Sequence, residues 1–290
     1  MIRVVENLAE ISSQYDAVFC DLWGCLHDGV RALPEAVEAL RAFKAKGGKV
    51  VLLTNAPRPR ADVARQLDRF GVPTDCWDTI ATSGDSARVA MFRGVIGEKV
   101  WFMGQNYDLT FFEPPHIVEN PVPIERVDLE DATGIACLGP FEPHADPAVN
   151  RPEFLYAKQK GLKLLCANPD IVVDRGGVRE WCAGALAELY TEMGGTSLYF
   201  GKPHPPVYTL ARQRLTALGA DVPDSRILCI GDGIGTDIKG ALGEDLDSLF
   251  ITGGLAREET RTELQPESQA LEDYVASFQI TPTFAIGHLR

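Results

Sequence analysis

The stretch Phe19-Cys20-Asp21-Leu22-Trp23-Gly24 ends a short apolar run with a carboxylate. The residues from Ala17 to Cys20 are all apolar, which predicts a buried strand that stops at Asp21. Three further stretches carry a polar or charged residue just beyond a short apolar run: Leu52-Leu53-Thr54-Asn55, Gly201-Lys202-Pro203 and Ile230-Gly231-Asp232-Gly233-Ile234-Gly235-Thr236-Asp237. In a parallel sheet such residues gather at the carboxyl edge, where open α/β folds bind ligands.

Helical patterns alternate with these strands. Pro34 opens a predicted helix that runs to about Lys46, where Gly47-Gly48 ends it. Residues 49–54 predict the next strand and residues 57–70 the next helix. This alternation is typical of right-handed crossovers in a parallel sheet.

A less regular region separates the two parts of this pattern. Between about residues 84 and 194, helices and strands still alternate, but prolines punctuate long loops. The regular alternation resumes with a predicted strand at residues 197–201. The sequence therefore predicts an α/β protein with a Rossmann-like parallel sheet core, made of residues 1–83 and 195–290. Residues 84–194 are predicted to form an inserted α/β cap domain with its own core.

Composition limits the classes of partner. The formal net charge of −13 argues against nucleic acid and against anionic membrane, because both require a surplus of Lys and Arg. The seven cysteines are scattered without a Cys-x-x-Cys pair, which predicts reduced, buried thiols. Arg3 and Glu6 interrupt the apolar N-terminal residues, and no run of about 18 apolar residues is present. We therefore expect a cytoplasmic protein without a signal peptide.

The residues at the strand ends supply the groups needed for phosphoryl transfer. A carboxylate such as Asp21 can attack phosphorus and form an aspartyl-phosphate that water then hydrolyses. Thr54 and Asn55 offer a hydroxyl and backbone N–H groups to a phosphoryl oxygen, and Lys202 can neutralise its charge. Each residue also has a plain structural interpretation, as a turn residue, a polar strand end or a surface charge. Only their order and placement together make the set specific.

Two further aspartates follow the strand that ends near Gly231. Asp232 lies between two glycines and is suited to Mg²⁺, which prefers carboxylate oxygens and keeps several waters. Asp237 lies at the start of a predicted helix, where it can also serve as a cap or N-terminal charge. We expect Asp237 near the metal or Lys202, but without direct coordination of the metal.

Taken together, these motifs resemble the haloacid dehalogenase superfamily of hydrolases. The large insertion, which contains Cys166-Ala167-Asn168-Pro169-Asp170, resembles the class IIA cap of nitrophenylphosphatases and of sugar- and nucleotide-phosphate phosphatases. The resemblance implies a Mg²⁺-dependent phosphatase acting through an aspartyl-phosphate on a small phosphorylated metabolite: a sugar phosphate, a nucleotide, or an aryl or acyl phosphate. It also suggests a homodimer formed through the cap.

The resemblance assigns roles to individual residues. Asp21 would be the nucleophile, and Thr54 and Lys202 would hold the phosphate. Asp21, Asp232 and the backbone carbonyl of Trp23 would be the protein ligands of Mg²⁺. Asn168 and Asp170 would lie on the cap loop that faces the substrate.

Trp23 departs from the usual pattern of the family. Phosphatases of this superfamily usually carry an aspartate two residues after the nucleophile, as general acid and base. The chain resembles a subset of class IIA-like proteins that has Asp-x-Trp-Gly instead. An indole N–H only donates a hydrogen bond and does not titrate usefully. General acid–base help contributes roughly 10²–10⁴-fold, and its loss should be felt most with poor, alkoxide leaving groups. His27 and Asp28 could supply a substitute acid, or could form a polar turn with Gly29.

Two other functions are compatible with parts of the sequence. A catalytically impaired relative that binds and senses a phosphorylated metabolite would explain Trp23, although such a protein has little need of an intact nucleophile. The second is a dinucleotide-dependent oxidoreductase, because Gly231-Asp232-Gly233-Ile234-Gly235 resembles part of a dinucleotide-binding fingerprint. That pattern fails at its third glycine, which is Thr236, and Asp232 would face a pyrophosphate with negative charge.

Overall fold

The structure of the chain is a computed structural model that describes residues 2–175 and 178–290. Its contacts divide it into two compact units. The first, called here the core unit, consists of Met1–Thr54, Ala64–Ala81 and Lys202–Arg290. The second, called the inserted unit, consists of Asn55–Val63 and Thr82–Gly201.

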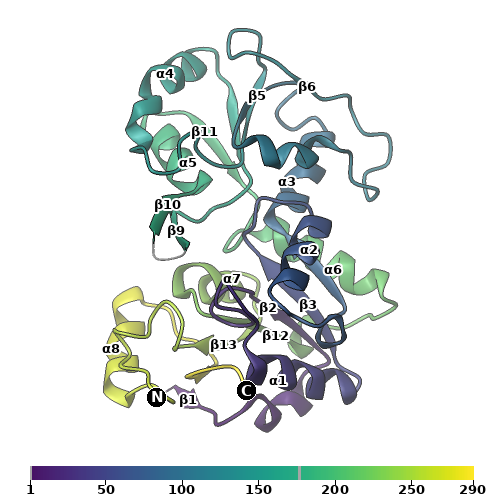
Figure 1. Cartoon of the computed structure of the whole chain (residues 1–290), viewed down its shortest axis with the longest axis vertical. Coiled ribbons are helices and arrows are strands. Elements are labelled where there is room, and N and C mark those ends of the chain that lie inside the picture. The colour runs from purple at the N-terminus through teal and green to yellow at the C-terminus, as the bar shows by residue number, and fades with distance from the viewer. Residues whose placement is uncertain (1, 176–177) are drawn as a thin grey trace. The chain divides into compact units, whose positions relative to one another are not determined.

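The core unit is built on a seven-stranded sheet (Figure 1). Its strands, in order across the sheet, are β1 (Arg3–Val4), β14 (Phe284–Ile286), β13 (Asp247–Ile251), β12 (Ile227–Gly231), β2 (Ala17–Cys20), β3 (Lys49–Thr54) and β4 (Thr79–Thr82). The pairs from β1 through β3 are parallel. Central strands β2, β3 and β12 are almost wholly buried, as expected for a parallel sheet covered on both faces.

Helices connect the core strands. They are α1 (Pro34–Ala45), α2 (Arg60–Arg69), α6 (Pro205–Ala217), a π turn η7 (Ile234–Ile238) that continues into α7 (Lys239–Gly243), and α8 (Ser268–Phe278). Short 3₁₀ turns add η1 (Leu8–Glu10), η2 (Ser12–Gln14), η3 (Thr74–Cys76) and η6 (Asp224–Arg226). Helix α1 illustrates the sequence logic, because Pro34 occupies its first turn and its buried face carries Ala36, Val37, Leu40 and Phe43 at helical spacing.

The inserted unit has its own sheet of five strands. Their order is β11 (Thr196–Tyr199), β8 (Lys163–Cys166), β7 (Gly134–Cys137), β5 (Lys99–Met103) and β6 (Glu125–Arg126), and all the pairs are parallel. A separate antiparallel pair joins β9 (Val172–Arg175) to β10 (Val178–Trp181). The helices are α3 (Ser83–Phe92), η4 (Asn106–Phe112), η5 (Pro147–Asn150), α4 (Arg151–Gln159) and α5 (Ala183–Glu192).

Alternate residues along the strands of the inserted unit belong to two different apolar clusters. Ile135 and Leu164 belong to a cluster with Phe154 of α4 and Leu186 of α5. The neighbouring strand residues, such as Leu165, belong instead to a cluster with α3 and η4. Because side chains alternate across a strand, the two clusters lie on opposite faces of the sheet. The inserted unit therefore has a core of its own.

The expected domain boundaries need correction. We expected the core to resume at residue 195 with a strand at residues 197–201, but β11 pairs with β8 inside the sheet of the inserted unit. The core unit resumes only at Lys202. Residues 55–63, expected in the core, group with the inserted unit. The first difference arises because a strand's hydrophobic pattern reports its burial and does not identify the sheet that it joins. Residues 55–63 are a loop and the start of α2, and they group with the inserted unit through contacts with distant residues, such as those of Asn55 with Asp170 and of Arg58 with Thr82.

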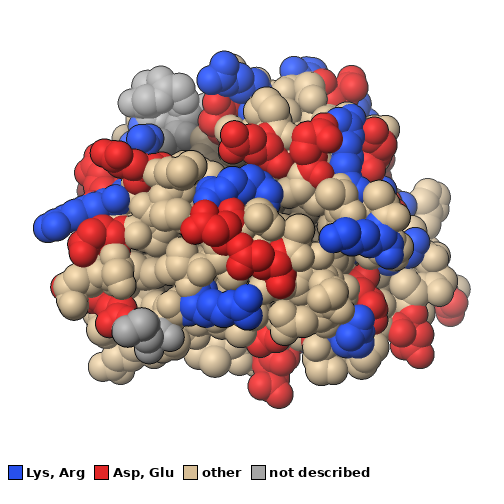
Figure 2. All heavy atoms as spheres, turned by 90° about the horizontal axis from the view of Figure 1, so that it is seen from below, with Lys and Arg blue, Asp and Glu red and all other residues tan. Residues whose placement is uncertain are grey.

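Charged side chains are mixed on the face of the molecule drawn in Figure 2, where acidic and basic residues lie next to one another. Arg226 and Asp16 form one of the ion pairs at the surface. Among the described residues, no helix is both long and apolar enough to cross a membrane. All seven cysteines are buried and free of disulfides.

Candidate active site

Three strand ends of the core unit bring polar side chains to one edge of the sheet. Cys20 of β2 pairs with Leu52 of β3 on one side and with Ile230 of β12 on the other. Asp21 follows this row by one residue, and Thr54 and Asp232 follow it by two. The Asp21 N–H donates to the carbonyl of Ile230 over 2.8 Å, which fixes the backbone of Asp21 beside β12. Asp21, Thr54 and Asp232 are all buried, as the strand-end argument requires.

Lys202 joins this edge from the loop that precedes α6. Its ammonium nitrogen lies 2.6 Å from Oδ1 of Asp21 and 2.7 Å from Oδ1 of Asp237. The side chain of Lys202 is only 3% exposed, so these are buried ion pairs. Burial alone disfavours the charged form, but the two carboxylates outweigh it and raise the pKa of Lys202 well above its usual value. Lys202 is therefore a fixed positive charge beside the Asp21 carboxylate.

Asp237 is held by the turn in which it lies. Its Oδ2 accepts hydrogen bonds from the N–H of Gly233, over 3.1 Å, and from the hydroxyl of Thr236, over 3.3 Å. Burial and the negative charge of Asp21 raise the pKa of Asp237 to about 6, against the opposing effect of Lys202. Asp237 thus contacts Lys202, which was one of the two neighbours expected for it from the sequence.

Asp21 and Asp232 form a group with Cys25 that has the dimensions of a cation site. One potential ligand atom from each of these buried residues lies within 4.8 Å of the others. Burial and the charges of Asp21 and Asp237 raise the pKa of Asp232 well above its usual value. A divalent cation would relieve this repulsion, and the carboxylate oxygens suit a hard ion. These residues therefore fit a divalent metal.

Two glycines allow the chain to approach Asp232. A Cβ atom at Gly24 would lie 2.2 Å from Oδ2 of Asp232, and one at Gly254 would lie 2.1 Å from the same atom. Gly24 also has a φ of +73°, which side chains rarely adopt. The next residue, Leu255, donates its N–H to this oxygen over 3.0 Å. The orientation of Asp232 therefore depends on backbone packed directly against it.

Cys25 and Gly254 lie at the site, although no sequence pattern indicated them. Cys25 lies four residues after Asp21, in the turn that carries Gly24 beside Asp232, so its proximity depends on turn geometry. Gly254 follows β13, the strand next to β12, and only the strand order places it near Asp232. A search for all residues just beyond the core strands would have included Gly254.

Trp23 packs against the turn that follows it. Its ring meets that of His27 edge to face, with centroids 5.7 Å apart. A Cβ at Gly29 would lie 2.3 Å from the indole, so only glycine leaves room for this packing. Nδ1 of His27 accepts the N–H of Gly29 over 3.0 Å, while Asp28 accepts from the next two backbone N–H groups. This is the polar turn that the sequence left open as an alternative.

His27 is poorly suited to act as the substitute acid. The side chain is 4% exposed, and burial lowers the pKa of His27 to about 4. The imidazole is therefore neutral near pH 7, with one nitrogen already engaged by the backbone. The geometry favours a structural role for His27 in supporting Trp23.

Three of the candidate residues belong to the inserted unit. Nδ2 of Asn55 donates to Oδ1 of Asp170 over 2.8 Å. Oδ1 of Asn168 accepts the N–H of Asp170 over 3.0 Å. Asn55 and Asn168 are buried, and the three residues form one connected polar group. The carboxylate that the resemblance assigns to substrate thus contacts a residue of the chain itself.

Comparison with known proteins shows the family to which the chain belongs. A family model described as haloacid dehalogenase-like hydrolase matches residues 18–114, and one described as HAD-hydrolase-like matches residues 199–278. A crystal structure of a haloacid dehalogenase-like hydrolase from Brucella suis 1330 is 34% identical, with a TM-score of 0.84. The similarity covers 99% of this chain and 100% of that one. The chain belongs to the haloacid dehalogenase superfamily.

Other relatives place this superfamily member in class IIA. It is 25% identical over 269 residues to the 5'-nucleotidase YutF of Bacillus subtilis, covering 86% of this chain and 91% of that protein. A glycerol phosphate phosphatase from Mycobacterium tuberculosis, solved in complex with magnesium, shares the fold at 24% identity and a TM-score of 0.66. That similarity covers 87% of this chain and 73% of that one. The protein is thus a hydrolase with the haloacid dehalogenase fold.

Proposed function

We propose that this hydrolase is a Mg²⁺-dependent phosphatase that acts on a small phosphorylated metabolite through an aspartyl-phosphate on Asp21. The observation that carries the proposal is the buried contact of Lys202 with Asp21, beside the Asp21–Asp232 carboxylate pair. A nucleophilic carboxylate, a fixed cation and a carboxylate pair for a metal are the groups that phosphoryl transfer requires. The 5'-nucleotidase activity named for YutF supports the same reaction class, since a 5'-nucleotidase also releases phosphate from a phosphate ester.

In the proposed reaction, a carboxylate oxygen of Asp21 attacks phosphorus while the bond to the leaving oxygen breaks. Lys202 holds the position of Asp21 and offsets negative charge on the phosphoryl group. The Thr54 hydroxyl donates a hydrogen bond to a phosphoryl oxygen. Water then attacks the aspartyl-phosphate, which releases inorganic phosphate and restores the carboxylate.

Mg²⁺ would be held by Asp21, Asp232 and the backbone carbonyl of Trp23. It would supply positive charge to the phosphoryl oxygens and offset repulsion between the carboxylates. The choice of a hard divalent ion such as Mg²⁺ rests on the oxygen ligands, and the glycerol phosphate phosphatase has been solved in complex with magnesium and with calcium. Asp237 would act through Lys202, because its carboxylate contacts that ammonium group.

Trp23 limits the range of substrates in this proposal. Neither the indole nor the buried, neutral His27 can readily protonate a leaving alkoxide. The leaving groups of acyl, aryl and anhydride phosphates depart without such protonation, whereas the alkoxide leaving groups of sugar phosphates depend on it. We therefore favour a substrate with a good leaving group.

A binding protein that has lost the reaction is the second candidate, and Trp23 is the feature that favours it. The intact set of Asp21, Lys202 and Asp232 favours an enzyme. As partners we propose a small phosphorylated molecule and a second copy of the chain, and neither nucleic acid nor a membrane. A cytoplasmic location is supported by the seven buried cysteines, which lie outside disulfides.

Trapping the phosphoenzyme separates the two candidates. The protein would be mixed with Mg²⁺ and ³²P-labelled acetyl phosphate, quenched in acid within milliseconds to seconds, and digested for peptide mapping. Label on the peptide containing Asp21, absent from Asp21→Asn, is the expected result. If the protein acquires no label although calorimetry shows that it binds Mg²⁺, the result would favour the binding protein.

A further inference from the structure

The two residues proposed to hold the phosphate lie where the chain passes between the two units. Thr54 is the last core residue before one passage, and Asn55 is the first residue of the inserted unit. Lys202 is the first core residue after another passage, and Gly201 is the last residue of the inserted unit. A single peptide bond therefore links each phosphate-binding residue to the inserted unit. Whatever fixes Asn55 and Gly201 also restrains Thr54 and Lys202.

Asn55 and Gly201 meet within the inserted unit. A Cβ at Gly201 would lie 2.5 Å from Oδ1 of Asn55, 2.6 Å from Cδ of Pro169 and 2.7 Å from Oγ of Ser83. No side chain fits at residue 201 without displacing one of these neighbours. The NH₂ group of the same Asn55 amide donates to Oδ1 of Asp170 over 2.8 Å. Asp170 therefore fixes which way the Asn55 amide faces, with its oxygen toward Gly201.

Asp170 is itself held firmly. Its N–H donates to Oδ1 of Asn168 over 3.0 Å, and its carbonyl accepts the N–H of Gly184 over 3.1 Å. A Cβ at Gly184 would lie 2.2 Å from the carbonyl oxygen of Pro169, so the loop after β8 rests directly on the start of α5. The backbone of Asp170 is therefore anchored, which suits its side chain to orient a neighbouring group.

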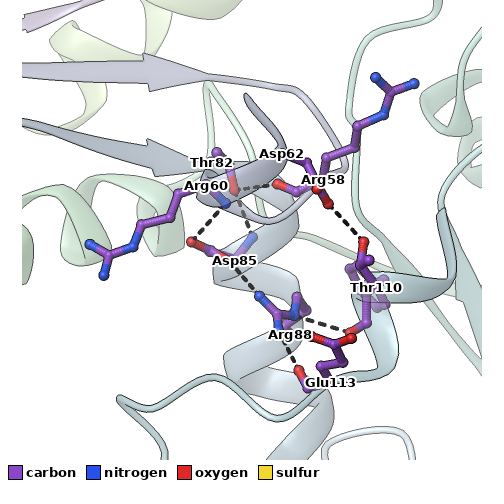
Figure 3. Close-up of polar contacts among 9 residues, drawn as sticks. Arg58, Arg60, Asp62, Thr82, Asp85, Arg88, Thr110 and Glu113 are labelled. Atoms are coloured by element: carbon purple, nitrogen blue, oxygen red, sulfur yellow. Dashed lines mark hydrogen bonds and ion pairs between the residues drawn. The ribbon is translucent and has the colours of Figure 1, made fainter. Parts of the chain in front are cut away.

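The segment that begins at Asn55 is also held near its other end, as Figure 3 shows. The hydroxyl of Thr82 donates to the carbonyl of Arg58 over 2.8 Å, and Asp85 accepts the N–H of Arg60 over 3.3 Å. Asp62 accepts the hydroxyl of Thr110 over 2.7 Å.

The supporting carboxylate of Asp85 is fixed in turn by Arg88. The guanidinium of Arg88 donates to Asp85 over 2.7 Å and also to the carbonyls of Phe111 and Glu113 (Figure 3). Asp85 and Arg88 are both buried, so this ion pair is shielded from solvent. The segment from Asn55 to Asp62 is therefore anchored at both ends to the rest of the inserted unit.

We propose that Asp170 is a positioning residue, which orients Asn55 and thereby the adjoining Thr54, and that it does not bind the substrate. This inference rests on the proposed phosphatase function and refines the role that the family resemblance assigns to Asp170. Oδ1 of Asp170 accepts the hydrogen bond from the Asn55 amide. Gly201, which precedes Lys202, packs against the other side of that amide. Misplacement of reacting groups by about 1 Å can cost 10²-fold in rate, so a lost hydrogen bond here has a measurable effect.

The test compares Asp170→Ala, Asp170→Asn, Asn55→Ala and the Asp170→Ala/Asn55→Ala double variant in the full-length protein. Activity is measured on acetyl phosphate, a minimal donor, and on a nucleoside monophosphate, a much larger one. Glu153→Ala removes an exposed carboxylate of α4 in the same unit and serves as the matched control. Asp21→Asn identifies the turnover that depends on the nucleophile.

A positioning role predicts that Asp170→Ala lowers kcat by about 10- to 100-fold on both donors alike. Asp170→Asn, whose amide oxygen can accept the same hydrogen bond, restores the rate to within a few fold. The double variant is no slower than the slower single variant, because the two residues act as one unit. A rise in KM confined to the larger donor would overturn the proposal in favour of substrate contact, as would unchanged kinetics in Asp170→Ala.

A second readout separates this inference from the phosphatase proposal. The side-chain NH₂ resonances of Asn55, assigned in ¹⁵N-labelled protein, should shift in Asp170→Ala and stay close to wild type in Asp170→Asn. If no donor gives Asp21-dependent turnover, the phosphatase proposal fails, and these resonances alone decide the role of Asp170. Resonances that do not move in Asp170→Ala would overturn it.

Discussion

Lys202 Nζ lies 2.6 Å from Oδ1 of Asp21, and both side chains are almost entirely buried. Asp237 contacts the same nitrogen over 2.7 Å, so one ammonium group serves two carboxylates. Asp232 adds a third carboxylate close to Asp21. One buried positive charge does not balance three carboxylates, which is the electrostatic reason to expect a divalent cation at this site.

Replacing Lys202 with methionine should destabilise the fold. The substitution keeps most of the volume but leaves Asp21 and Asp237 as buried carboxylates without their cation. Breaking a buried pair in this way costs about 3–5 kcal/mol, measurable by urea unfolding at pH 7. Adding Asp237→Asn should recover part of the loss. Lys239→Met, at an exposed position, is the control, and equal stability of the two methionine variants would refute the argument.

Gly24→Ala should weaken metal binding. A methyl group at this position would lie 2.2 Å from Oδ2 of Asp232 and would force the carboxylate to move. Gly47 provides a matched control, because its φ is also positive at +95° but a Cβ there would contact nothing within 4 Å. Both alanine variants carry backbone strain, but only Gly24→Ala should lose Mg²⁺ affinity, by about 10-fold or more, in titration calorimetry. Equal affinity in both variants would exclude Asp232 from the metal site.

Trp23→Asp should introduce the missing general acid. The gain in kcat is expected on alkyl phosphates, by up to about 10²-fold, with little change on acyl or aryl phosphates. The aspartate forfeits the indole packing on His27 and Gly29, so Trp23→Phe is the control for lost contact without an acid. If Trp23→Asp improved no alkyl phosphate while the protein stayed folded, another group would already be the acid.

His27 should make the protein less stable in mild acid. Burial lowers the pKa of His27 in the fold to about 4, from 6.5 when exposed. Above pH 6.5 the imidazole is neutral in both states and has no effect. Below that pH the unfolded chain binds the proton first, so stability falls by about 3 kcal/mol as the pH drops from 6.5 to 4.

The matched variant for this prediction is His27→Gln, which cannot titrate in that range. Its free energy of unfolding, measured by urea denaturation at several pH values, should depend less steeply on pH between 6.5 and 4 than that of the wild type. Parallel pH profiles of the two proteins would mean that His27 is not held neutral by the fold.

Much of the core could be predicted from local pattern. The strand Ala17–Cys20 and the strand Lys49–Thr54 occur where continuous apolar runs predict them. Since parallel strands share one carboxyl edge, the ends of the strands Ala17–Cys20 and Ile227–Gly231 also predicted that Asp21 and Asp232 would lie close together. Lys202 was predicted from its place beyond an apolar run, although the strand before it belongs to the other sheet.

What the sequence did not yield depends on contacts between distant segments. The pairing of β11 with β8 joins segments that are distant along the chain, and no local pattern reports it. The bond from Asn55 to Asp170 joins residues 115 positions apart. The proximity of Cys25 and Gly254 to Asp232 likewise follows from turns and strand order, neither of which hydrophobic periodicity encodes.

The measurement that tests the central claim most directly is Mg²⁺-dependent release of phosphate from acyl, aryl, nucleotide and sugar phosphates, by the wild type and by Asp21→Asn. We predict turnover that falls as the pKa of the leaving group rises, and that Asp21→Asn abolishes. Turnover that survives in Asp21→Asn, or no turnover on any donor with Mg²⁺ bound, would contradict a phosphatase built on Asp21 and Lys202.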